Sequence, residues 1–407
     1  MKRLLPILEK SLVALIFLLF CAPLVHWGGK AVSSWATPKI CKWRGEPVPR
    51  SARHHKKRKK ALAQASDWKK DITKEFNENF LFRTELIRGT NEAFFRLWNV
   101  SPAPIAEVAI GKDDFLYEKG YLREYFLDRP KAESLVPLVE KIKRFQDLCD
   151  RCGIKFALLI TPGKPSIHPE HIPDEWMERY DSRPRAYALF LPLLQRYGVR
   201  YVDGPAITQQ AKPQTPTSIF SKGGTHWTYH GALFTTNALI DCLREQGEDL
   251  ARIETTPPKV SNEPTGTDTD LLVFINLLKP WNYPVTQFDI KPADTEKPRL
   301  GRMTFIGGSF SWQIAQEIEA SKQFSEVDVF FYYKIYKAIN SSIVGTRGSM
   351  RMPTGTVDFE NEIYANECLV LELNETIIAT QKHLSAFLDD AFAHLPQRDA
   401  KVETLAR

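Results

Sequence analysis

Hydrophobic residues change their spacing several times along the chain, and each change marks an expected element. Residues 155–161 form a continuously apolar run, which is typical of a strand buried on both faces of a parallel sheet. Apolar residues at helical spacing over 132–150 and 183–197 predict helices before and after that strand. Alternation of this kind predicts an α/β fold with a mostly parallel sheet sandwiched by helices.

The alternation continues toward the C-terminus. Further strands are expected over 199–203, 302–306, 327–333 and 368–373, and further helices over 228–245, 312–320 and 376–395. Residues 246–300 are rich in Pro and Thr and predict irregular structure, apart from a short helix at 270–278. Earlier in the chain, residues 108–117 predict a short strand, a polar turn and a second strand.

The N-terminal part follows a different pattern. Nineteen uncharged residues, Ser11–Gly29, lie between Lys10 and Lys30, and they are enough to cross a bilayer as a helix. A cleaved signal peptide is one alternative, but no small-x-small cleavage site follows the apolar run. A buried helix of a soluble protein is the other. We therefore predict an uncleaved signal anchor, although charge alone does not choose its orientation, because basic residues flank it on both sides.

Composition divides the chain into expected regions. These are a cytoplasmic tip and signal anchor (1–30), a basic linker (31–66), a helical lead-in and hairpin (67–130), the main α/β domain (131–395) and a tail (396–407). Much of the net charge of +6 comes from the run Arg50–Lys60. This run is typical of a solvated linker, and contact with anionic lipid or a polyanion is the functional alternative. Nucleic acid is not expected as a partner, because no aromatic residues interleave with the charges.

The cysteines leave the compartment open. Cys149 and Cys152 form a CxxC pair, but no second pair or nearby histidine completes a zinc site. Plain thiols, a disulfide and a redox or metal role all remain open for this pair.

Three segments carry residues suited to chemistry. Ser309 follows an expected strand and begins an expected helix, so it lies at the carboxyl edge of the sheet, where α/β folds bind ligands. Gly307 and Gly308 before it permit a tight turn with bare N–H groups that could receive an oxyanion. His226 lies at a loop-to-helix junction and could act as general base to a serine. Lys164, after strand 155–161, could bind an acidic sugar or an oxyanion.

Each segment also has an ordinary structural interpretation. The serine turn can be a helix N-cap, the histidine a hydrogen-bonded loop residue, and the lysine part of a surface loop shaped by prolines.

The order of the motifs is more informative than any one of them. They are Gly-Lys-Asp-Asp-Phe-Leu-Tyr (111–117), Pro-Gly-Lys-Pro (162–165), Thr-His-Trp (225–227), Gly-Gly-Ser-Phe (307–310) and Leu-Val-Leu-Glu-Leu-Asn-Glu (369–375). Together they resemble the SGNH hydrolase-like domain of the alginate O-acetyltransferase family, over roughly residues 70–390. The form that it resembles is membrane-anchored and lacks a carbohydrate-binding module.

The resemblance implies an SGNH-like fold and a periplasmic O-acetyltransferase of exopolysaccharide biosynthesis. Ser309 would match the nucleophile and His226 the base. The acceptor would be a polysaccharide and the acetyl donor a membrane-bound O-acyltransferase, with the chain anchored once in the inner membrane and its main domain in the periplasm. No metal and no cofactor are implied.

Two positions depart from the family pattern. Gly224 stands where the family has the triad aspartate, and Gly308 stands where it often has an aspartate before the nucleophile. A triad acid fixes the tautomer of the histidine and stabilises its cation. Either another acid, with Asp203 a candidate, takes this role, or the activity is weak or lost. A polysaccharide acetyl-esterase and a non-catalytic scaffold or polysaccharide-binding subunit are therefore the alternative functions.

Overall fold

The computed structural model describes residues 83–101, 107–179, 181–279, 281–293, 299–333, 336–339 and 357–396. The predicted signal anchor, the basic linker and most of the tail lie outside them. The chain separates into two compact units, Met1–Thr90 and Asn91–Arg407. Helix α5 (Arg83–Trp98) crosses this boundary, and the second unit carries all the other described elements. None of the described helices has the length and apolarity that a membrane span requires.

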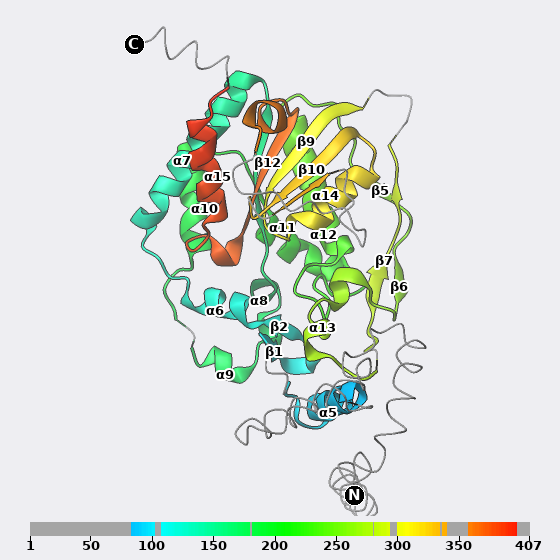
Figure 1. The fold of residues 1–407 in the computed structure, drawn as a ribbon. Helices are drawn as coiled ribbons and strands as arrows, with labels where there is room; N and C mark the ends of the chain where they lie inside the picture. The colour runs from blue at the N-terminus through cyan, green and yellow to red at the C-terminus, as the bar shows by residue number, and fades with distance from the viewer. Residues whose placement is uncertain are drawn as a thin grey trace, which may run out of the picture. The chain divides into compact units, whose positions relative to one another are not determined.

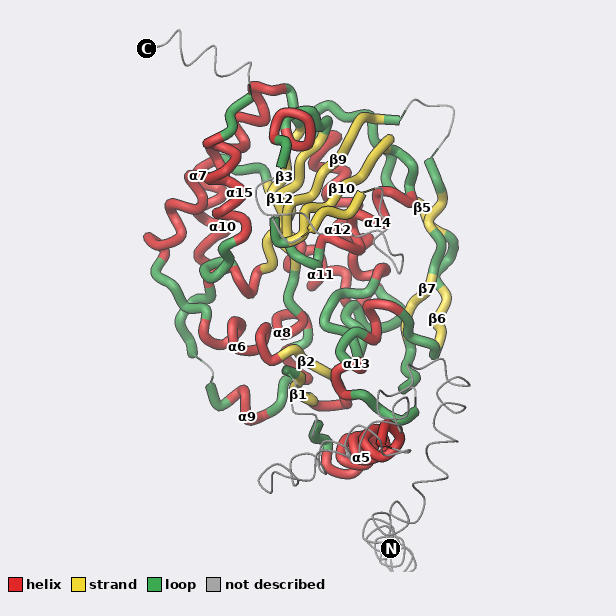
Figure 2. The backbone as a smooth tube through the Cα atoms, viewed as in Figure 1, coloured by secondary structure: helices red, strands yellow, loops and turns green. Residues whose placement is uncertain are grey.

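The second unit is built around a six-stranded sheet (Figures 1 and 2). Its strands are β3 (Lys155–Thr161), β4 (Tyr201–Asp203), β9 (Leu300–Gly307), β10 (Phe324–Phe331), β11 (Tyr336–Ile339) and β12 (Cys368–Asn374). They lie in the order β11-β10-β9-β12-β3-β4, and every pairing is parallel except that of β11 with β10. The predicted mostly parallel sheet is therefore confirmed.

Helices cover both faces of this sheet, as Figure 1 shows. One layer holds α7 (Ala132–Cys152), α10 (Ala186–Tyr197) and α15 (His383–Ala393); the other holds α11 (Gly204–Ala211), α12 (Tyr229–Arg244) and α14 (Ser311–Ala320). Further helices are α6 (Lys119–Leu127), α8 (Lys164–Ile167), α9 (Asp174–Met177) and α13 (Leu272–Ile275). Three two-stranded sheets flank the core: β1 (Val108–Ile110) with β2 (Leu116–Glu118), β5 (Glu254–Thr255) with β8 (Ile290–Lys291), and β6 (Lys259–Ser261) with β7 (Val285–Gln287).

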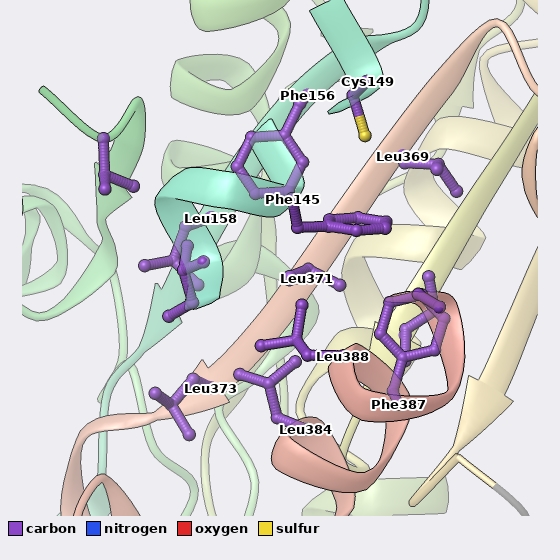
Figure 3. Close-up of a cluster of buried hydrophobic side chains, with 14 of the residues drawn as sticks. Phe145, Cys149, Phe156, Leu158, Leu369, Leu371, Leu373, Leu384, Phe387 and Leu388 are labelled. Atoms are coloured by element: carbon purple, nitrogen blue, oxygen red, sulfur yellow. The ribbon is translucent and has the colours of Figure 1, made fainter. Parts of the chain in front are cut away.

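Alternate residues of each strand enter opposite cores, because successive side chains of a strand point to opposite faces. Phe156 and Leu158 of β3 pack under α7, α10 and α15. Ala157 and Leu159, which alternate with them, pack under α12 and α14. Figure 3 shows the first of these cores, in which Phe145 and Cys149 of α7 meet β12 and α15. The continuously apolar sequence of β3 is therefore explained by burial on both faces.

Cys149 is a buried free thiol in this core. Burial raises its pKa well above the ordinary value, so the thiol stays protonated and unreactive near neutral pH.

Candidate active site

Ser309 lies where the sheet turns into a helix. It follows the end of β9 at Gly307 and precedes α14, which begins at Ser311. The Ser311 hydroxyl donates to the Gly308 carbonyl at 2.7 Å, and the Trp312 N–H donates to the Ser309 carbonyl at 3.2 Å. This turn leaves the Ser309 side chain partly exposed at the carboxyl edge of the parallel sheet. The location predicted for the serine is the one the structure gives.

His226 reaches this serine from the loop before α12. Thr228 caps α12 by accepting the Gly231 N–H at 3.1 Å, and the fully buried Trp227 fixes the loop between them. His226 Nε2 lies 2.7 Å from Ser309 Oγ, and its ring packs on Phe310 with 4.8 Å between ring centroids. The two residues predicted separately from their motifs are therefore brought together.

An acid that the sequence did not single out completes the arrangement. Asp270 Oδ2 lies 2.5 Å from His226 Nδ1, and Asp270 Oδ1 accepts the Thr225 N–H at 2.7 Å. Because an ionised carboxylate can only accept, Nδ1 carries the hydrogen and Nε2 is left to accept the Ser309 hydroxyl proton. Ser309, His226 and Asp270 thus have the connectivity of a Ser-His-Asp triad.

The loop that carries Asp270 is tied to the histidine loop by several bonds. The Leu271 N–H donates to the Gly223 carbonyl at 3.0 Å, and the Ser221 hydroxyl donates to the Asp268 carbonyl at 2.8 Å. The Tyr283 hydroxyl also donates to the Asp268 carbonyl, and it accepts the Gly223 N–H at 3.1 Å. These contacts fix the acid against the base although they lie 44 residues apart in the chain.

Gly224 explains why the acid comes from this loop. A Cβ at position 224 would overlap the Thr267 carbonyl oxygen and lie only 2.7 Å from Ser221 Oγ. The absence of a side chain therefore lets residues 267–270 pack where an aspartate at position 224 would extend. Asp203, the substitute considered from sequence, has another role: it caps α11 by accepting the Ala206 N–H at 3.1 Å and accepts the Tyr187 hydroxyl at 2.7 Å.

Lys164 contacts the loop that precedes His226. Its buried ammonium donates to the carbonyl oxygens of Ser221, Lys222 and Gly224 at 2.6, 3.1 and 2.7 Å. Burial lowers the pKa of Lys164 to about 7, while the nearby carboxylates of Asp270 and Asp268 oppose this shift. All three donors are occupied, so these contacts give no support to the predicted role in binding sugar or oxyanion. They make Lys164 an anchor of the loop that precedes His226.

A buried acid holds the nucleophile turn. Glu372 of β12 accepts the Gly308 N–H at 2.6 Å and the Thr161 hydroxyl, and burial raises its pKa to about 7. A Cβ at Gly307 would lie 2.5 Å from the Glu372 Cβ, so only glycine fits there. The Gly308 amide, predicted as an oxyanion donor, is engaged with this carboxyl group. Sequence reasoning had placed Glu372 in a motif without assigning it a role.

Other acids surround the histidine. Glu118 accepts the Thr225 hydroxyl at 3.2 Å, and burial raises its pKa. Burial also raises the pKa of Asp268 to about 7, with the Asp270 carboxylate as the next cause. Of these three acids, Asp270 is the one whose carboxyl oxygen lies within hydrogen-bond distance of the imidazole.

Among the described residues, one cluster has the composition of a metal site. Ligand atoms of His168, Glu170 and His171 lie within 4.8 Å of one another. The Lys212 ammonium donates to Glu170 Oε1 at 2.7 Å, and His168 Nε2 lies 3.0 Å from the Ser218 hydroxyl. These contacts account for the cluster as a charge-balanced structural group.

Comparison with known proteins places this site in a family. The family model described as "SGNH hydrolase-like domain, acetyltransferase AlgX" matches residues 108–315, just over half of the chain. The probable alginate O-acetylase AlgJ of Pseudomonas aeruginosa is 29% identical over 143 residues, which are 34% of this chain and 33% of that protein. Its counterpart from Pseudomonas syringae pv. tomato is 28% identical over 125 residues, 31% of this chain and 30% of that protein. The matches span about a third of the length of these curated relatives.

Two solved structures are also similar. The O-acetyltransferase domain of Pseudomonas putida AlgJ is 21% identical with a TM-score of 0.45, covering 71% of this chain and 98% of that one. Pseudomonas aeruginosa AlgX is 14% identical with a TM-score of 0.41, covering 68% of this chain and 64% of that one. The match of the family model, together with the parallel sheet and its helices, shows that this chain has the SGNH-like α/β fold and belongs to the AlgX-type family of SGNH hydrolase-like domains.

Proposed function

We propose that this protein is an O-acetyltransferase that modifies an exopolysaccharide through an acetyl-serine intermediate. The observation that carries this proposal is the chain of contacts from Asp270 through His226 to Ser309, with distances of 2.5 and 2.7 Å. An acid, a base and a hydroxyl in this order form the arrangement that activates a serine for acyl transfer.

The reaction proceeds in two halves. Ser309 Oγ attacks the carbonyl carbon of the acetyl donor while His226 Nε2 takes the hydroxyl proton, and Asp270 stabilises the imidazolium that forms. Collapse of the tetrahedral intermediate breaks the bond to the leaving group, which receives the proton from His226. A hydroxyl of the acceptor then attacks the carbonyl carbon of acetyl-Ser309 and gives its proton to His226. The second tetrahedral intermediate collapses, the bond to Ser309 Oγ breaks, and His226 returns the proton to Ser309 Oγ as the ester passes to the acceptor.

The relatives support the substrate class. Two matched proteins are named probable alginate O-acetylases, so a polysaccharide hydroxyl is the acceptor that we propose here. By resemblance to the family, the domain would work in the periplasm, held by the predicted anchor, with a membrane-bound O-acyltransferase as donor. An alkaline phosphatase fusion after Arg407 should be active if this location is right. A silent fusion alongside an active cytoplasmic reporter would contradict it.

Labelling of the serine tests the chemistry. Incubation of the whole chain with a slow activated acetyl ester should leave Ser309 about 42 Da heavier, the mass of acetyl in place of hydrogen. Ser309→Ala should abolish the label, whereas Ser325→Ala, at an exposed serine bonded to the Gly301 carbonyl, should not. Added oligosaccharide should receive the acetyl group. Release only to water would favour the esterase, and a wild-type protein that never labels would favour the non-catalytic scaffold.

A further inference from the structure

Tyr332 lies over the nucleophile in an unusual backbone conformation. It follows the end of β10, and both Tyr332 and Tyr333 have positive φ angles, 44° and 61°. Residues other than glycine rarely adopt a positive φ angle. Where they do, surrounding contacts hold the backbone in this conformation, often at functional sites. Here the Tyr332 N–H donates to the Gly307 carbonyl at 2.8 Å, while Tyr333 is buried and its hydroxyl donates to Asp390 at 2.9 Å.

This conformation directs the Tyr332 side chain to the reacting atom. Its hydroxyl donates to Ser309 Oγ at 3.3 Å, and its ring meets His383 edge to face with centroids 5.4 Å apart. A Cβ at Gly308 would lie 3.4 Å from the ring edge of Tyr332 and 3.4 Å from Glu372 Oε2. A carboxylate extending from position 308 would meet both groups. The glycine that departs from the family pattern thus leaves room for the tyrosine ring.

The acetyl transfer needs a hydrogen-bond donor beside Ser309. Both tetrahedral intermediates carry a negative oxygen on the carbon bonded to Ser309 Oγ, two bonds from that atom. The Gly308 N–H, predicted to stabilise this charge, is engaged with Glu372 at 2.6 Å. The phenolic O–H of Tyr332 is a donor that already lies against Ser309 Oγ and can follow the developing oxyanion.

We propose that Tyr332 is a catalytic residue that donates its hydroxyl hydrogen bond to the oxyanion in both halves of the acetyl transfer. This inference rests on the proposed function of Ser309. No proton leaves the tyrosine: the bond to the carbonyl oxygen strengthens as negative charge develops and weakens as the carbonyl re-forms.

The test separates this role from one in which Tyr332 only holds Ser309 in place. Tyr332→Phe keeps the ring and its contact with His383 and removes the hydroxyl alone. With the full chain and an activated acetyl ester, the variant should acetylate Ser309 about 100- to 1000-fold more slowly, at unchanged melting temperature. Transfer from acetyl-Ser309 to an oligosaccharide should slow by a similar factor, because the oxyanion forms again.

Three outcomes decide the matter. A hydroxyl that only positions the serine would slow acetylation but leave the second half unchanged, since the acetylated oxygen no longer needs orienting. That result, or rates within twofold of wild type in both halves, would overturn the inference while Ser309→Ala still shows that the serine is the nucleophile. A wild-type protein that never labels would overturn the proposed function itself. Tyr197→Phe, whose exposed hydroxyl bonds Glu140, is the matched control and should keep wild-type rates.

Discussion

In the proposed mechanism, the activity of His226 depends on Asp270. Asp270→Asn keeps the size of the side chain but turns a pure acceptor into a group that can also donate, so the tautomer of His226 is no longer fixed. We expect kcat to fall by about 1000- to 10,000-fold with little change in the free energy of unfolding. The acetylation rate of Ser309 measures this, and Asp203→Asn serves as a control for loss of a carboxylate that caps a helix. Equal rates in wild type and Asp270→Asn would show that the acid is not needed.

Gly224 gives a second prediction at this scale, opposite to the one that the family pattern suggests. From sequence alone, Gly224→Asp would restore a missing acid and raise the rate. In the structure the new side chain overlaps the Thr267 carbonyl and displaces the loop that carries Asp270. We therefore expect Gly224→Asp to lower both the melting temperature and the acetylation rate. Gly120→Ala is the control, because a Cβ there meets nothing closer than 3.7 Å. A faster Gly224→Asp enzyme would contradict this account.

At the scale of elements, Lys164 joins the start of α8 to the loop before α12. Lys164→Met preserves the volume but leaves three carbonyl oxygens without their shared donor, two of them in bonds buried from solvent. We expect the free energy of unfolding to fall by about 3 kcal/mol, since each buried unsatisfied group costs about 1–3 kcal/mol. Denaturant titration measures this. Lys112→Met removes an exposed ion pair with Asp174 and should change stability by less than about 1 kcal/mol.

The same variant separates anchoring from substrate binding. If Lys164 holds the loop, kcat falls because His226 is displaced, and the loss is the same for neutral and acidic acceptors. A rise in KM confined to acidic acceptors, at unchanged stability, would instead support the role predicted from sequence.

Local patterns in the sequence predicted most of the elements, and the exceptions have identifiable causes. β3 has the predicted bounds, because its five successive apolar residues, 156–160, are buried on both faces of the sheet and indicate a strand clearly. The helix expected over 376–395 begins only at His383, because Asn374 accepts the Thr376 N–H and caps a short 3-10 turn instead. The helix expected over 270–278 spans only Leu272–Ile275, since Asn276 adopts a left-handed conformation that ends it.

In the candidate site, too, local sequence patterns predicted some residues and tertiary contacts placed the others. Ser309 and His226 lie in short motifs next to elements with clear periodicity, so both were predicted. Asp270 lies in a segment without periodicity, and only tertiary hydrogen bonds bring it to the histidine. Gly224 was the one signal available, and it indicated only that the usual acid was missing. Tyr332 and Glu372 likewise act through contacts between elements distant in sequence.

For the whole molecule, buried acids determine how stability depends on pH. The pKa of Glu372 is raised by burial from its ordinary value of 4.5 to about 7, and Asp268 and Asp128 are raised to about 7 as well. Between these values the folded state binds more protons than the unfolded state, so stability falls as pH rises from about 4.5 to 7. Glu372 alone accounts for about 3 kcal/mol of this loss.

Glu372→Gln tests this dependence. Glutamine can accept the Gly308 N–H and donate to Thr161 without any charge, so the variant should lose less stability than wild type between pH 5 and pH 8. Melting temperatures measured across this range give the comparison. Glu254→Gln changes an exposed glutamate, and its melting temperature should vary with pH in the same way as that of wild type. A Glu372→Gln curve that also runs parallel would show that this carboxyl group does not titrate as argued.

The origin of the acid in a distant loop has a consequence for how the site forms. In the family pattern, acid and base are two residues apart and are aligned as soon as their loop forms. Here His226 is separated in sequence from Asp270 by 44 residues and from Ser309 by 83. Bringing each pair together restricts the chain between them, and this loss of conformational entropy precedes the contacts that offset it. During refolding, the return of Ser309 acetylation should therefore lag behind the return of helical signal and report the moment at which these distant segments have docked.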